Sequence, residues 1–104
     1  MTDYAVVLTA FPNEELAKQM ARNLLEKKLA ACVQLFPINS FYWWDDKICD
    51  DSEIMLFIKC NKKHYAQIEA AIIEKHTYET PEIIMIPVNA GFSKYLGWID
   101  DVCK

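Results

Sequence analysis

Apolar residues occur along this chain in two patterns, short continuous runs typical of buried strands and stripes at helical spacing. Residues 4–9 form a short apolar run rich in β-branched side chains and predict a strand. Residues 16–25 carry apolar side chains at helical spacing. Asn13 stands before this stripe as a predicted N-cap, and Lys27 and Lys28 suit the negative end of the helix dipole. The pattern therefore predicts a strand followed by an amphipathic helix.

The rest of the chain continues as short apolar segments separated by polar breaks. The polar residues between 44 and 53 predict a long hairpin. The predicted segments are, in order, a strand over residues 30–36 closed by Pro37, a strand-like stretch over 40–44, a strand over 53–60, a helix capped by Asn61 and running to about Lys75, a strand over 83–88, and a last helix over Ser93–Val102.

This order of elements predicts an α+β protein. Two βαβ halves with an antiparallel sheet make the ferredoxin-like plan, here with a long β-hairpin and a short C-terminal helix. The length suits a single domain over residues 1–104.

The predicted strands are apolar on both faces, although an antiparallel sheet with one wet face alternates apolar and polar residues. Residues 5–8, 54–58 and 83–86 all show this continuous pattern. Two helices cover only one face of a sheet. We therefore expect a second copy of the chain to cover the other.

Composition and charge exclude several classes of protein. The net charge is −4 and no basic stripe is visible, so nucleic-acid binding has no electrostatic support. Every apolar run is far shorter than the ~18 residues that span a bilayer, so no membrane partner is expected. No leader segment is visible, and Cys32, Cys49, Cys60 and Cys103 lack zinc-site spacing, so we predict free thiols and a cytoplasmic location.

Five segments in the same order along the chain resemble the CutA (divalent-cation tolerance) family. Each motif alone is weak, but together they span nearly the whole sequence. The matching segments are Ala30-Ala31-Cys32-Val33, Ser40-Phe41-Tyr42-Trp43-Trp44, Glu53-x-x-Leu56-x-x-Lys59, His76-x-Tyr78-Glu79-x-Pro81-Glu82-Ile83 and Tyr95-Leu96-x-Trp98-Ile99.

The resemblance implies a ferredoxin-like homotrimer with architecture similar to the PII signalling proteins, and a link to divalent-cation tolerance and copper binding. Four positions depart from the family pattern, one of which is Cys60, where a threonine is frequent. Asp46 stands at a frequent turn glycine, and Thr77 replaces a common proline. Thr9 stands where some bacterial members carry a cysteine implicated in copper binding, which weakens the case for an identical metal site.

His76, Glu79 and Cys32 are the candidate metal ligands. An imidazole with nearby carboxylates or a thiolate suits copper or zinc, and a thiolate suits Cu(I). His76 and Cys32 also have simpler interpretations. His76 interacts with the end of its helix, and Cys32 is a small residue on a buried strand. Tyr42, Trp43 and Trp44 either stack a ligand or pack against neighbouring copies.

The leading hypothesis is a cytosolic homotrimer that binds a divalent metal, copper foremost, in cation tolerance. One alternative is a PII-like sensor that binds a small anionic ligand between subunits. Another is a stable scaffold with adventitious metal binding. No catalytic motif stands out, so an enzyme is not expected.

Overall fold

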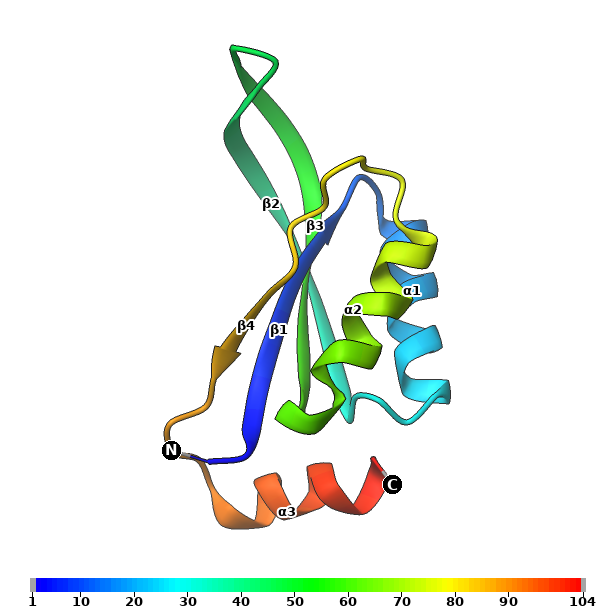
Figure 1. The fold of residues 1–104 in the computed structure, drawn as a ribbon, viewed down its shortest axis with the longest axis vertical. Coiled ribbons are helices and arrows are strands. Elements are labelled where there is room, and N and C mark those ends of the chain that lie inside the picture. The colour runs from blue at the N-terminus through cyan, green and yellow to red at the C-terminus, as the bar shows by residue number, and fades with distance from the viewer. Residues whose placement is uncertain (1, 104) are drawn as a thin grey trace.

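Four antiparallel strands in the order β2-β3-β1-β4 form the sheet, and helices α1 and α2 lie on one of its faces (Figure 1). The computed structural model describes residues 2–103. The elements are β1 (Tyr4–Phe11), α1 (Glu14–Glu26), β2 (Cys32–Trp44), β3 (Lys47–Asn61), a 3₁₀ turn (Lys62–His64), α2 (Tyr65–Lys75), β4 (Ile84–Pro87) and α3 (Ser93–Val102). This topology confirms the predicted ferredoxin-like α+β fold.

The Asn13 cap predicted for α1 is present, whereas the Asn61 cap predicted for α2 is found one short turn earlier. The Leu16 backbone N–H donates to the Asn13 side chain at 2.9 Å, and the Lys63 backbone N–H donates to the Asn61 side chain at 2.9 Å. Asn61 caps the 3₁₀ turn that leads into α2 rather than α2 itself. At the end of α1, Lys28 takes a positive φ of 58°, an uncommon conformation for a residue with a side chain. Both helices thus begin and end close to the residues that the sequence indicates.

The prediction that Pro37 closes a strand was wrong. Strand β2 runs without interruption from Cys32 to Trp44, and Pro37 pairs with Ile54 of β3 inside it. Proline is tolerated there because β2 is an edge strand, where alternate N–H groups have no partner strand. The predicted strands at 30–36 and 40–44 are therefore one strand.

The hairpin of β2 and β3 extends well beyond the two helices, and the molecule measures 44 Å along its longest axis (Figure 1). The polar stretch 49–52 is part of β3, not a break. Asp45 and Asp46 form the turn with φ values of 53° and 59°, as a type I′ turn requires. Aspartate at position 46 thus keeps the turn without glycine, as predicted from the sequence.

The core lies between the inner face of the sheet and the two helices. Side chains of β1 and β3 alternate, so that Ala5, Val7, Leu56 and Ile58 point toward the helices and are buried. The facing helix residues are Ala17, Met20 and Leu24 of α1 and Ile68, Ala71 and Ile72 of α2. Each large side chain buried here contributes about 1.5–3 kcal/mol to folding.

The opposite face of the sheet, called the outer face here, is apolar and is left largely uncovered by the described residues of one chain (Figure 1). Register places its members side by side, because cross-strand partners share a face. Helix α3 crosses one end of the sheet, opposite the hairpin turn, and does not cover this face. The large apolar residues of the outer face are Val6 and Leu8 of β1, Phe36 of β2, Met55 and Phe57 of β3, and Ile84 and Ile86 of β4, and Cys32, Gln34 and Lys59 lie on the same face.

One polar atom in the core gives a stability prediction. The Thr9 hydroxyl is fully buried and has no hydrogen-bond partner among residues 2–103. Thr9→Val keeps the side-chain shape and removes this hydroxyl. We expect the free energy of unfolding in urea to stay the same or rise by up to about 1 kcal/mol.

Val7→Thr is the matched control, because Val7 is equally buried two residues away on the same face of β1. It adds an unpaired hydroxyl and should lower the free energy of unfolding by about 1–3 kcal/mol. A clear loss of stability in Thr9→Val would show that the Thr9 hydroxyl is satisfied in solution.

Candidate functional site

A groove separates the hairpin from the loop that joins α2 to β4. We call it the hairpin groove. Its larger part has a volume of about 680 Å³ and is lined by Ala10, residues 39–44, Glu53, Tyr78 and residues 80–82. A smaller hollow of about 320 Å³ adjoins it and shares Tyr42, Trp44, Tyr78 and Thr80. The groove thus has one wall on a regular strand and one on a loop.

His76 holds that loop against the end of β1. Its Nε2 atom lies 2.7 Å from the Ala10 carbonyl oxygen, and its Nδ1 atom accepts from the Tyr78 backbone N–H at 3.1 Å. The ring also stacks on Phe11, with centroids 4.1 Å apart. Because Nδ1 accepts a hydrogen bond, Nε2 carries the proton and donates to Ala10. Both ring nitrogens of the neutral imidazole are therefore engaged.

The surroundings of His76 favour this neutral form. Partial burial lowers the pKa of His76, while the Ala10 carbonyl and the Glu53 carboxylate oppose that shift. The imidazole contacts β1, rather than the last carbonyls of α2 as its simpler interpretation suggested. Neutral His76 thus holds the loop to the sheet through hydrogen bonds at both of its ring nitrogens.

Two tyrosine–carboxylate pairs line the groove. The Tyr78 hydroxyl donates to Glu53 Oε2 at 2.8 Å, and only 9 % of Glu53 is exposed. Burial and this hydrogen bond raise the pKa of Tyr78. The Tyr42 hydroxyl donates to Asp51, which raises the pKa of Tyr42 to about 12. Both phenols therefore stay protonated as donors at physiological pH.

The structure does not bring the three predicted metal ligands together in one chain. Glu79 is exposed on the loop. Cys32 pairs with Lys59 and, through it, lies level with Val6, four residues along β1 from the Ala10 carbonyl that His76 contacts. Four residues of strand correspond to roughly 13 Å. Within residues 2–103, no group of three His, Cys, Asp or Glu side chains is placed to hold a metal ion.

Glu53 and Tyr78 are the groove residues that sequence reasoning missed. Both lie in the motif segments quoted above, but 25 positions separate them and only the fold joins them. Glu53 directly follows the polar, solvent-exposed part of β3. Its burial is therefore not apparent from the sequence. The available signal was the position of this acid directly before the apolar run of residues 54–58.

The charge of the hairpin groove has one sign. Glu53 and Glu82 line its larger part and Glu79 its smaller part, whereas no lysine, arginine or histidine among residues 2–103 lines either part. Carboxylates in a partly enclosed groove repel anions and attract cations. The arrangement therefore favours a cationic occupant.

Comparison with known proteins gives consistent matches over the chain. Residues 5–102 match the family model described as CutA1 divalent ion tolerance protein. The divalent-cation tolerance protein CutA of Archaeoglobus fulgidus is 42% identical over 99 residues, which cover 95% of this chain and 96% of that protein. The protein of the same name from Pectobacterium atrosepticum is 37% identical over 101 residues, covering 96% and 92%.

Solved structures agree with these matches. The structure of the periplasmic divalent cation tolerance protein CutA from Archaeoglobus fulgidus has a TM-score of 0.96 and 38% identity, covering 97% of this chain and 99% of that one. CutA1 from Shewanella sp. SIB1, described as a stable protein, has a TM-score of 0.92 and 40% identity, covering 96% and 94%.

The cytoplasmic location predicted from the sequence is contradicted by the first of these structures, because that relative is described as periplasmic. Free thiols and an acidic surface are properties of the folded chain and do not identify a compartment. No helix within residues 2–103 is long and apolar enough to cross a membrane.

The lowered pKa of His76 predicts a pH dependence of stability. The unfolded chain takes up a proton at His76 below about pH 6.5, whereas the folded chain resists it. The stabilisation is therefore fully present above pH 6.5 and is lost as pH falls toward the folded pKa. Urea unfolding from pH 7.5 to 5 should show this loss, and His76→Gln should reduce its slope.

Burial also lowers the pKa of His64, so His64 adds its own loss of stability over the same pH range. The comparison is therefore made in a His64→Gln background. If the free energy of unfolding falls equally steeply as the pH is lowered in that background whether or not His76 is present, His76 does not hold the loop in its neutral form.

Proposed function

The chain belongs to the CutA1 divalent ion tolerance protein family, and from this premise we propose that it acts in divalent-cation tolerance as a homotrimer that binds a divalent metal, copper foremost. The observation that carries the proposal is the apolar outer face of the sheet. Ile84 and Ile86 are about half exposed there on β4, and Phe36 of β2 and Phe57 of β3 contact each other on the same face. A contiguous apolar patch of this kind is typical of a protein interface.

Three copies bury the same face of every chain around one axis. Closed rotational symmetry makes each contact identical and leaves no free interface. The family resemblance implies this trimer, and the uncovered outer face supports it independently.

The metal proposal requires more than one copy. His76 does not fit as a ligand in this conformation, because Tyr78 N–H occupies its lone pair and its other nitrogen carries the proton. Cys32 is half-buried, and its register places it on the outer face. We therefore assign Cys32 and exposed carboxylates such as Glu79, contributed by different copies, as the ligands. Thiolate suits copper and zinc.

The charge of the hairpin groove weighs against the PII-like alternative with an anionic ligand. The scaffold alternative has some support from relatives: one solved CutA1 is described as a stable protein, and one CutA was solved in the presence of 3M guanidine hydrochloride. Our proposal is of binding rather than catalysis, because the histidine beside the groove has both nitrogens engaged.

The trimer is tested with two isoleucines of similar exposure. Ile84 on the outer face is 49% exposed, and Ile73 on α2 is 57% exposed on the helical side of the sheet. Ile84→Asp places a charge in the proposed interface, where burial without a partner costs several kcal/mol. Sedimentation equilibrium should show a trimer for the parent and for Ile73→Asp, and dissociation for Ile84→Asp.

A parent chain that sediments as a monomer at micromolar concentration would refute the trimer. Equal dissociation in both variants would show that charge anywhere on the surface is responsible, and not the outer face.

Metal binding is tested by anaerobic calorimetry on chelator-treated protein. Zn(II), which does not oxidise free thiols, is the main ion, and Cu(II) is added as a second ion. Cys32→Ser should weaken binding about tenfold, or 1.4 kcal/mol. Glu79→Gln should weaken it by a smaller factor, since a carboxylate is the harder ligand. His76→Ala should leave the affinity within about twofold of the parent's.

Cys49→Ser is the matched control, since Cys49 is also a half-exposed free thiol. If Cys49→Ser alone abolishes binding, the metal is held adventitiously and the scaffold alternative gains. A large loss in His76→Ala would mean that His76 turns out of its hydrogen bonds to bind the ion.

A further inference from the structure

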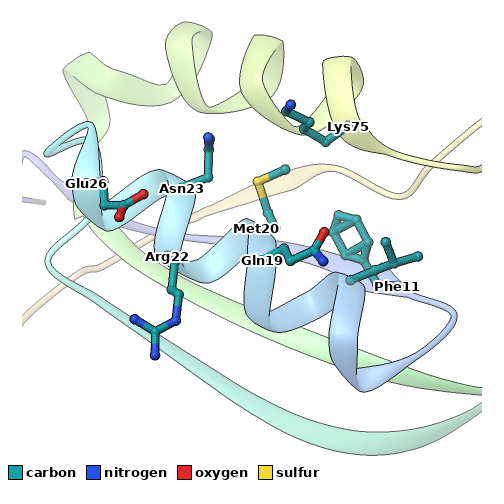
Figure 2. A pocket seen from close by; sticks show the side chains of 8 residues that line it. Phe11, Gln19, Met20, Arg22, Asn23, Glu26 and Lys75 are labelled. Carbon is teal, nitrogen blue, oxygen red and sulfur yellow. The ribbon is translucent and has the colours of Figure 1, made fainter.

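A hollow of about 330 Å³ lies between α1 and α2, on the helical side of the sheet and opposite the outer face (Figure 2). Its floor is apolar, because Phe11 of β1 and Met20 of α1 are almost fully buried there and Leu16 is half-buried. Pockets for small ligands in proteins are typically apolar hollows of about this size or larger with a few polar groups. The hollow therefore stays open when other copies cover the outer face.

Polar side chains of α1 line one wall of the hollow. Gln19, Asn23 and Glu26 follow one another at intervals of four and three residues, which places them on one face of the helix. Figure 2 shows Asn23 pointing toward α2, whereas the neighbouring Arg22 points away from α2. This wall thus offers amide groups and one carboxylate to a ligand.

Asn23 carries an acceptor that the chain leaves without a donor. Its Oδ1 atom is buried and has no hydrogen-bond partner among residues 2–103. Buried acceptors in proteins are usually satisfied by a protein group, an ordered water or a ligand. An ammonium group bound in the hollow would supply the missing donor. Glu26, less than one turn further along α1, would add the opposite charge.

The opposite wall carries a positive charge. Lys75 is the last residue of α2 and lines the hollow from that helix (Figure 2). Within residues 2–103 it forms no salt bridge, and neither does Glu26. The Lys75 ammonium can therefore donate to a carboxylate of a ligand. The hollow thus combines an unpaired cation, an unpaired anion and an apolar floor.

We propose that this hollow binds a free α-amino acid with an apolar side chain. Its ammonium group donates to Asn23 Oδ1 and faces the Glu26 carboxylate. Its own carboxylate accepts from Lys75, and its side chain lies against Phe11 and Met20. A ligand with a single charge would leave one of the two walls without a partner. The site uses no residue of the outer face, so it depends neither on the trimer nor on the proposed metal binding.

The test uses the intact protein and three probes at constant ionic strength. L-leucine carries both charged groups, 4-methylpentanoate lacks the amino group, and 3-methylbutylammonium lacks the carboxylate. The readout is the methionine methyl resonances in proton–carbon correlation spectra, since Met20 lies in the floor and Met55 lies on the outer face. Leucine should shift Met20 and leave Met55 unchanged. Each of the other two probes should bind at least about fivefold more weakly.

Lys75→Gln should weaken leucine binding at least about fivefold, because it removes the charge that the ligand carboxylate contacts. Lys27→Gln is the matched control, since Lys27 is also an exposed lysine at a helix end but does not line the hollow. Asn23→Leu should weaken leucine binding by a similar factor. Its free energy of unfolding in urea should stay the same or rise, because the acceptor without a donor is removed.

Several results would overturn the proposal. Equal binding of leucine and 4-methylpentanoate would make the hollow an anion site, and equal binding of leucine and 3-methylbutylammonium would make it a cation site. The absence of a Met20 shift with leucine would remove the site altogether, as would an unchanged leucine affinity in both Lys75→Gln and Asn23→Leu. None of these results bears on the trimer or on metal binding.

Discussion

The central strand β1 is apolar on both faces, and this constraint shapes the rest of the molecule. Ala5 and Val7 point to one side and are buried by α1 and α2, whereas Val6 and Leu8 point to the other. Two helices are enough to cover the inner face of a sheet this size, but not the outer face as well. The fold of one chain thus buries one side of the sheet and leaves an apolar face on the other, which is the basis of the proposed association.

The far end of the same strand anchors the functional side of the molecule. Phe11 and the Ala10 carbonyl receive the His76 ring, and His76 in turn holds Tyr78 through its backbone N–H. Tyr78 then reaches Glu53 on the hairpin. A series of contacts from the core to the loop and on to the hairpin therefore sets the shape of the hairpin groove. His76, first considered as a metal ligand, is one of the residues that make these contacts.

The proposed metal site and the proposed amino-acid site lie on opposite sides of the sheet. Family membership connects the chain with divalent-cation tolerance, and a metal ion needs several donors that one chain does not assemble. The hollow between α1 and α2 instead lies within one chain, away from the outer face.

Local patterns in the sequence determined the helices, the Asn13 cap of α1, the Asp45–Asp46 turn and the two-faced strands, because each depends on neighbours a few residues away. The family motifs likewise identified the fold. Only the tertiary structure decided that Pro37 lies inside a strand, since its tolerance depends on which strand is at the edge of the sheet. It also decided the roles of His76 and Glu53. Their partners, Ala10 and Tyr78, are 66 and 25 positions away, and such pairings follow from packing that no local pattern records.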